Sequence, residues 1–84
     1  MQTPEYAIGE VEVEGVPCTQ VCVWLPGVKS VGEVDLEVSA DELCVSVEEL
    51  YELTLELPHS IDEDNPSARY DKAMQKLTMT LPHL

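Results

Sequence analysis

The chain has 84 residues and a mass of 9.3 kDa, which allows one domain (residues 1–84) with a modest core and no deep substrate cavity. Seventeen acidic side chains against four basic ones give a formal charge of −13, which argues against direct binding to nucleic acid or to an anionic membrane surface. Three cysteines cannot all pair, and no secretory or membrane-spanning pattern is found, so we expect a cytoplasmic or nuclear location.

The first quarter of the sequence predicts two strands. Residues 5–13 form the first. Its apolar side chains switch from one face of the strand to the other near the middle, which predicts a bulge at Gly9. Residues 19–25 form the second, with aliphatic side chains on one face and Trp24 on the other. This second strand is therefore either covered on both faces or presents Trp24 to a partner.

Three runs of alternating apolar and polar residues follow, at 33–38, 43–47 and 51–57. A period of two, with one apolar and one largely acidic face, is typical of half-buried strands in an antiparallel sheet. Their spacing of roughly 8–10 residues is typical of a meander.

The C-terminal third predicts a hairpin, with strands at 67–71 and 77–81 and a turn at 72–75. The acidic loop before it, 58–66, lacks the pattern of a calcium loop because Pro66 takes the place of the third ligand. No segment shows a helical apolar stripe. The chain is therefore predicted to be all-β, a seven-stranded antiparallel β-sandwich.

Patterns of catalytic chemistry are sparse. His59 and His83 each follow a proline at the end of a strand, and we expect two separate, exposed imidazoles. Cys18 and Cys22 have no second pair of ligands, and the strand between them keeps the thiols apart. We therefore expect no catalytic residue, no cofactor and no metal site. An enzyme would need a bound metal or a reactive cysteine.

Charged side chains form two regions of opposite sign. One is a row of carboxylates on the outer positions of the predicted strands, formed by Glu33, Asp35, Glu37, Glu42, Glu52 and Glu56. Such a face is either a solvated surface that keeps sheets from stacking or a docking surface for a basic segment. Arg69 and Lys76 make the last hairpin locally basic, where they either attract an acidic peptide or offset nearby carboxylates.

Several segments, in this order, carry a resemblance to a known family. They are PEY at 4–6, LPGVKSV at 25–31, VDLEVS at 34–39, YELTLELP at 51–58, ID at 61–62, ARYD at 68–71 and KLTMTLP at 76–82. Together they resemble the C-terminal CS domain of the PIH family, proteins that interact with heat-shock protein 90. The resemblance extends from about residue 3 to residue 81 and implies the CS fold shared with small heat-shock proteins. We therefore expect the chain to be the C-terminal domain of a longer protein.

The resemblance also implies a role. Domains of this kind act as adaptors in an assembly of heat-shock protein 90, a tetratricopeptide-repeat co-chaperone and RuvB-like ATPases, and they capture an extended tail of the tetratricopeptide-repeat partner. The assembly matures box C/D small nucleolar ribonucleoproteins and other large complexes; some members serve dynein pre-assembly. The alternatives are a CS domain that contacts heat-shock protein 90 directly and a self-associating holdase like a small heat-shock protein. We expect a monomer.

An open sandwich suits an adaptor because its edge strands carry unpaired N–H and C=O groups to which an extended tail can add a strand. We predict that the partner binds along the edge beside the acidic face and at the end that carries the single tryptophan. For that tryptophan, a core or edge-covering role is an equal alternative. The predicted contact residues are Trp24, Leu25, Val28, Glu33, Asp35, Glu37, Arg69 and Lys76.

Overall fold

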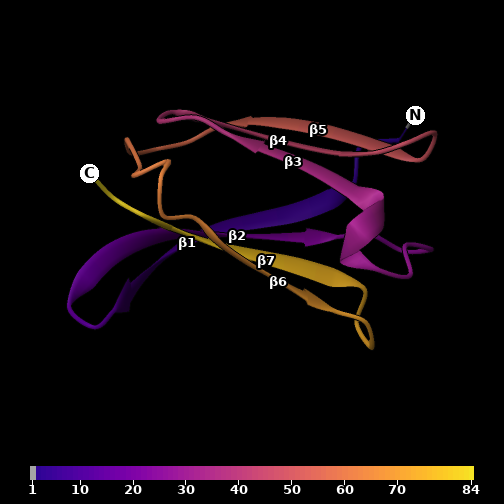
Figure 1. Cartoon of the computed structure of the whole chain (residues 1–84), viewed down its shortest axis with the longest axis horizontal. Helices are drawn as coiled ribbons and strands as arrows, with labels where there is room; N and C mark the ends of the chain where they lie inside the picture. Colours follow the sequence, from indigo (N-terminus) through magenta and orange to yellow (C-terminus); the bar gives the residue numbers. More distant parts are fainter. Residues whose placement is uncertain (1) are drawn as a thin grey trace.

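Two antiparallel sheets face each other in the computed structural model, which describes residues 2–84 (Figure 1). The four-stranded sheet has the order β1-β2-β7-β6 and the three-stranded sheet the order β3-β4-β5. The predicted seven-stranded sandwich is therefore confirmed. The strands are β1 (Glu5–Val13), β2 (Val16–Trp24), β3 (Val34–Val38), β4 (Glu42–Val47), β5 (Tyr51–Glu56), β6 (Ser67–Asp71) and β7 (Lys76–Pro82), with a 3-10 turn at Val31–Glu33.

The three-stranded sheet is the predicted meander, formed by strands that follow one another in the chain. Its inner side chains alternate with outer carboxylates and hydroxyls, so one face is dry and the other is wet. Leu43, Val45 and Val47 of β4 are buried, and Leu53 and Leu55 of β5 join them.

Within residues 2–84, no helix has the length and apolar character needed to cross a bilayer.

A two-residue turn joins β1 to β2. Glu14 and Gly15 both have positive φ, 51° and 83°, and Val13 is the register partner of Val16. This is the type I′ geometry that matches the twist of the flanking strands, and it favours glycine at its second position. The turn lets β2 start at Val16, three residues earlier than the sequence predicted.

The predicted bulge at Gly9 is wrong. The register of β1 and β2 is unbroken from the Glu5–Trp24 pair to the Val13–Val16 pair. The parity change needs no extra residue because β1 is an edge strand, exposed along almost its whole length. Its apolar side chains therefore do not have to share one core-facing side.

The hydrophobic core lies between the two sheets and also takes in residues from the connections. Leu25 and Val28 come from the segment that joins β2 to β3, and Ile61 comes from the loop between β5 and β6. The remaining buried core residues lie on the inner faces of the strands: Val21 and Val23 of β2, Leu43, Val45 and Val47 of β4, Leu53 and Leu55 of β5, and Leu77, Met79 and Leu81 of β7.

Two tyrosines from different sheets hold the β2–β3 connection in place. The Tyr51 hydroxyl on β5 donates to the Pro26 carbonyl at 2.7 Å, and the Tyr70 hydroxyl on β6 donates to the Val28 carbonyl at 2.5 Å. The Leu25 N–H donates to the Gln75 carbonyl in the β6–β7 turn at 2.8 Å. These bonds satisfy backbone groups of a connection whose side chains enter the core.

The Tyr70 hydroxyl makes stability sensitive to high pH. Burial raises its pKa above the ordinary 10.0, and the charges of Glu33 and Asp71 raise it further. The folded chain therefore keeps this proton at a pH where the unfolded chain releases it. The contribution of the Tyr70 hydroxyl to the free energy of unfolding is fully present below about pH 10 and is lost as the pH rises above it. Tyr70→Phe should remove this part of the alkaline loss and cost about 1 kcal/mol at neutral pH through the lost hydrogen bond. Urea unfolding from pH 7 to 11 checks it; identical pH profiles for the two proteins contradict it.

Candidate protein-interaction surface

Two adjacent hollows on the outer side of the three-stranded sheet are lined by carboxylates. The first contains Asp35, Glu37 and Glu52 over a floor that includes Cys44 and Thr54. The second shares Asp35 with the first and extends to the β4–β5 turn. We call the two hollows together the acidic face, and its carboxylates belong to Glu33, Asp35, Glu37, Glu48, Glu49 and Glu52.

Strand register explains why these acids gather. Asp35 on β3 is paired with Ser46 on β4, which in turn is paired with Glu52 on β5, so the three side chains form one row across the sheet. Of the residues described, no lysine or arginine lines either hollow. The face therefore has a negative potential that favours a cationic partner and is screened by salt.

The acidic face borders an edge strand. β3 pairs with β4 on one side, and within residues 2–84 no strand pairs with its other side. Val34, Leu36 and Val38 pack against the core from this strand, which fixes it in an extended form. Such an edge can accept another strand through main-chain hydrogen bonds, while nearby pockets select side chains.

The structure brings Asp35 and Glu37 of the predicted set together and adds Glu52, which the sequence analysis did not include among the contact residues. The alternation of β5 had already placed Glu52 in the predicted row of outer carboxylates. Glu33 differs from these three, because its Oε2 accepts the backbone N–H groups of Lys29 at 2.9 Å and Ser30 at 3.1 Å. This carboxylate therefore holds its own loop as well as lining the second hollow.

The prediction that Leu25 and Val28 contact a partner needs correction. Leu25 is 0% exposed and Val28 is 1% exposed, so neither side chain reaches the surface. The segment that contains them crosses from one sheet to the other, and the two tyrosine hydroxyls bind its carbonyls. Leu25 and Val28 are core residues of this connection.

The other predicted residues lie on the far side of the sandwich. Trp24 and Lys76 are register partners on β2 and β7, and their alternation places them on the outer face of the four-stranded sheet. Arg69 follows on β6. Lys76 is also the register partner of Asp71, so an acidic residue neighbours this cation. The predicted contact residues therefore divide between two opposite faces.

The two histidines lie together, contrary to the expectation from the sequence. The ring centroids of His59 and His83 are 4.6 Å apart. His59 follows β5 in one sheet and His83 follows β7 in the other, and Ile61 bridges to His83. Only the arrangement of the two sheets brings these strand ends together, so spacing in the sequence gave no signal.

Cys18 and Cys22, by contrast, do not converge. Both lie on β2, four residues apart, and the rise of a strand separates them by about 13 Å. The Cys22 thiol is 3.8 Å from the Thr78 hydroxyl, and the Cys18 thiol donates to the Val16 carbonyl at 3.4 Å. The two thiols therefore have separate local partners and cannot share one metal ion.

Comparison with known proteins relates the chain to one family of domains. A family model described as the PIH1 CS-like domain matches residues 3–84. PIH1 domain-containing protein 2 from Danio rerio is 39% identical over 62 residues, which cover 74% of this chain and 19% of that protein. Protein kintoun from Chlamydomonas reinhardtii is 42% identical over 62 residues, covering 74% of this chain and 9% of that protein. The chain thus spans about a fifth or less of these relatives.

A solved structure shows the same fold. Heat shock protein 16.0 from Schizosaccharomyces pombe superposes with a TM-score of 0.77 over 100% of this chain and 89% of that one. The sequence identity is 23%, so this likeness concerns the fold. It confirms the prediction of a sandwich like that of the small heat-shock proteins.

Proposed function

Because this chain belongs to the family of PIH1 CS-like domains, we propose that it is a non-catalytic protein-interaction module that captures an extended, basic segment of a partner chain. One observation supports this most directly: two carboxylate-lined hollows lie beside the free edge of β3. The partner segment adds to β3 as a further strand and places its cationic side chains over Asp35, Glu37 and Glu52. Main-chain bonds give affinity and the hollows give selectivity.

The partner class follows from the family resemblance. We propose the extended tail of a tetratricopeptide-repeat co-chaperone, with heat-shock protein 90 and RuvB-like ATPases joined through the assembly. In this proposal the assembly matures box C/D ribonucleoproteins in the cytoplasm or nucleus. The second candidate is direct contact with heat-shock protein 90. A pull-down with the isolated chaperone separates the two, because the adaptor role needs the tetratricopeptide-repeat partner for capture and direct contact does not.

Nuclear magnetic resonance tests the binding edge. A synthetic peptide of the tetratricopeptide-repeat tail, titrated into the ¹⁵N-labelled chain, should shift or broaden the amide signals of Val34–Val38 in sequence order, because new main-chain bonds form along that strand. Signals of β6, one of the two edge strands of the other sheet, serve as the internal control. Shifts confined to the loop at 58–66 or to the β1–β2 turn would contradict strand addition at β3.

The same sample tests the holdase alternative. A self-associating chaperone core would have a mass in solution that rises with concentration, and it would suppress aggregation of an unfolded client. We expect a monomer by light scattering and no suppression of aggregation.

A further inference from the structure

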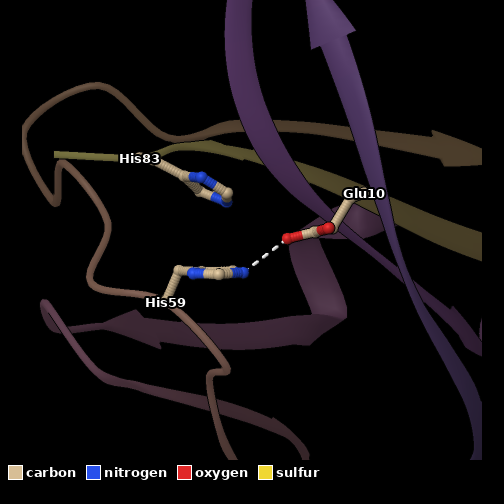
Figure 2. A group of neighbouring side chains, drawn as sticks. All are labelled: Glu10, His59 and His83. Atoms are coloured by element: carbon tan, nitrogen blue, oxygen red, sulfur yellow. Dashed lines mark ion pairs between the residues drawn. The ribbon is translucent and has the colours of Figure 1, made fainter.

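Three side chains from distant parts of the chain meet beside the ends of β5 and β7 (Figure 2). Glu10 extends from β1, His59 from the loop after β5, and His83 from the residue that follows β7. Each offers a metal-ligating atom, and these atoms all lie within 4.8 Å of one another. The Nε2 atom of His59 is 2.5 Å from Oε1 of Glu10.

The fold holds one of the three ligands firmly and leaves two adjustable. The backbone N–H of His83 donates to the Pro17 carbonyl at 3.0 Å. The ring Nε2 of His83 is 2.8 Å from Oγ1 of Thr19, a residue that is 0% exposed. Thr19 is the register partner of Glu10, which puts both side chains on the inner side of the four-stranded sheet. The side chains of Glu10 and His59 are 59% and 50% exposed, so they are free to rotate.

Two imidazoles and one carboxylate form the donor set that zinc takes in open sites, with the fourth position left to water or another donor. Zinc bonds of about 2.0–2.2 Å put tetrahedral ligand atoms about 3.3 Å apart. The ligand atoms reach that spacing if rotation of the Glu10 and His59 side chains moves them by about 1–2 Å, which the exposure of both side chains permits. The Thr19 hydroxyl beside His83 resembles the outer partner that orients a metal-binding imidazole.

We propose that Glu10, His59 and His83 bind a zinc ion. The ion forms one bond to an oxygen of Glu10 and one bond to a ring nitrogen of each histidine. The short contact between His59 and Glu10 then breaks. Any proton held between them passes to solvent. The open fourth position lies in a shallow pocket that Val11, Glu12 and Pro17 also line.

The expected consequence is a link between the two sheets. Glu10 belongs to β1, an edge strand of the four-stranded sheet, whereas His59 follows β5, an edge strand of the three-stranded sheet. The Gln2–Tyr51 bridge already joins the segment just before β1 to β5. Zinc at Glu10 would fasten the strand a second time, near its other end, and this would stabilise the folded state.

Thermal unfolding and cobalt spectroscopy of the whole chain test the proposal. After treatment with a chelator, added zinc at about 100 times its dissociation constant should raise the melting temperature by roughly 10–20 °C, because it binds the folded state. Cobalt(II) should give the visible absorption of a tetrahedral site without sulfur-to-metal charge transfer. His59→Gln and His83→Gln should each weaken zinc binding more than about tenfold, and Thr19→Val should weaken it about tenfold through the outer partner.

Matched variants separate this site from others. Glu5→Gln removes a carboxylate from the same strand, and Cys44→Ser removes a half-buried thiol on the opposite sheet; both should leave zinc affinity unchanged. The proposal is overturned if zinc shifts the melting temperature of His59→Gln as much as that of the wild type. It is equally overturned if the shift is absent from the wild type or is lost in Cys44→Ser.

Discussion

Leu25→Ala should lower the free energy of unfolding by about 2–5 kcal/mol, a large share of the roughly 5–15 kcal/mol that holds a domain folded. Leu25 is completely buried although it lies outside the strands. Its backbone is bound to the Gln75 carbonyl, so the segment cannot collapse freely into the space that the missing atoms leave. The lost transfer free energy and the cavity therefore both count against the variant.

Val31→Ala in the same connection is the matched control. Val31 is 52% exposed, so its truncation should change the unfolding free energy by less than about 0.5 kcal/mol. Urea unfolding followed by the fluorescence of Trp24 measures both variants. If Leu25→Ala cost no more than Val31→Ala, Leu25 would not be a core residue, and it would again be a candidate contact residue.

Reversing the charge of Asp35 and Glu37 together should weaken capture of a basic partner segment more than about tenfold. Exposed ion pairs contribute about 0.2–1 kcal/mol each, and reversal replaces two attractions by two repulsions, whereas about 1.4 kcal/mol is a factor of ten. The effect should be largest at low salt and should shrink as screening increases. Isothermal titration with the tail peptide at two salt concentrations measures it.

A second double variant controls for the change in overall charge. Glu12→Lys with Glu14→Lys alters the net charge by the same amount, but it does so at the β1–β2 hairpin, away from the acidic face. Binding to this variant should change little. Equal losses in both double variants would mean that the partner responds to the total charge of the chain, and the acidic face would be discarded as the binding site.

Alternation of side chains was sufficient to predict the meander and the last strand, because β3, β4, β5 and β7 each bury one face more than the other. Val45 and Leu53, for example, alternate with Ser46 and Glu52, and that pattern fits no helix. The same pattern places Asp35 and Glu37 on the outer face. Local sequence thus determines most of the fold and the carboxylate row.

Alternation could not predict features that depend on contacts between distant segments. Val28 follows the Pro-Gly pair after the predicted strand 19–25, a pattern typical of an exposed loop, and only the crossing between sheets buries it. His59 and His83 are 24 positions apart and meet only because their strands end on the same side. The bulge predicted at Gly9 is wrong because the apolar side chains of this exposed edge strand do not all have to lie on one core-facing side.

The order of the strands also has a consequence for how the chain folds. The meander is continuous from Val34 to Glu56, so its strands find each other by short searches. The centre of the other sheet instead joins β2 to β7, and its Trp24–Lys76 pair closes a loop of roughly 50 residues. Closure of such a loop costs entropy before any contact offsets it, which slows the search. The pairing of β2 with β7 is therefore expected to limit the folding rate, and the meander is expected to form earlier.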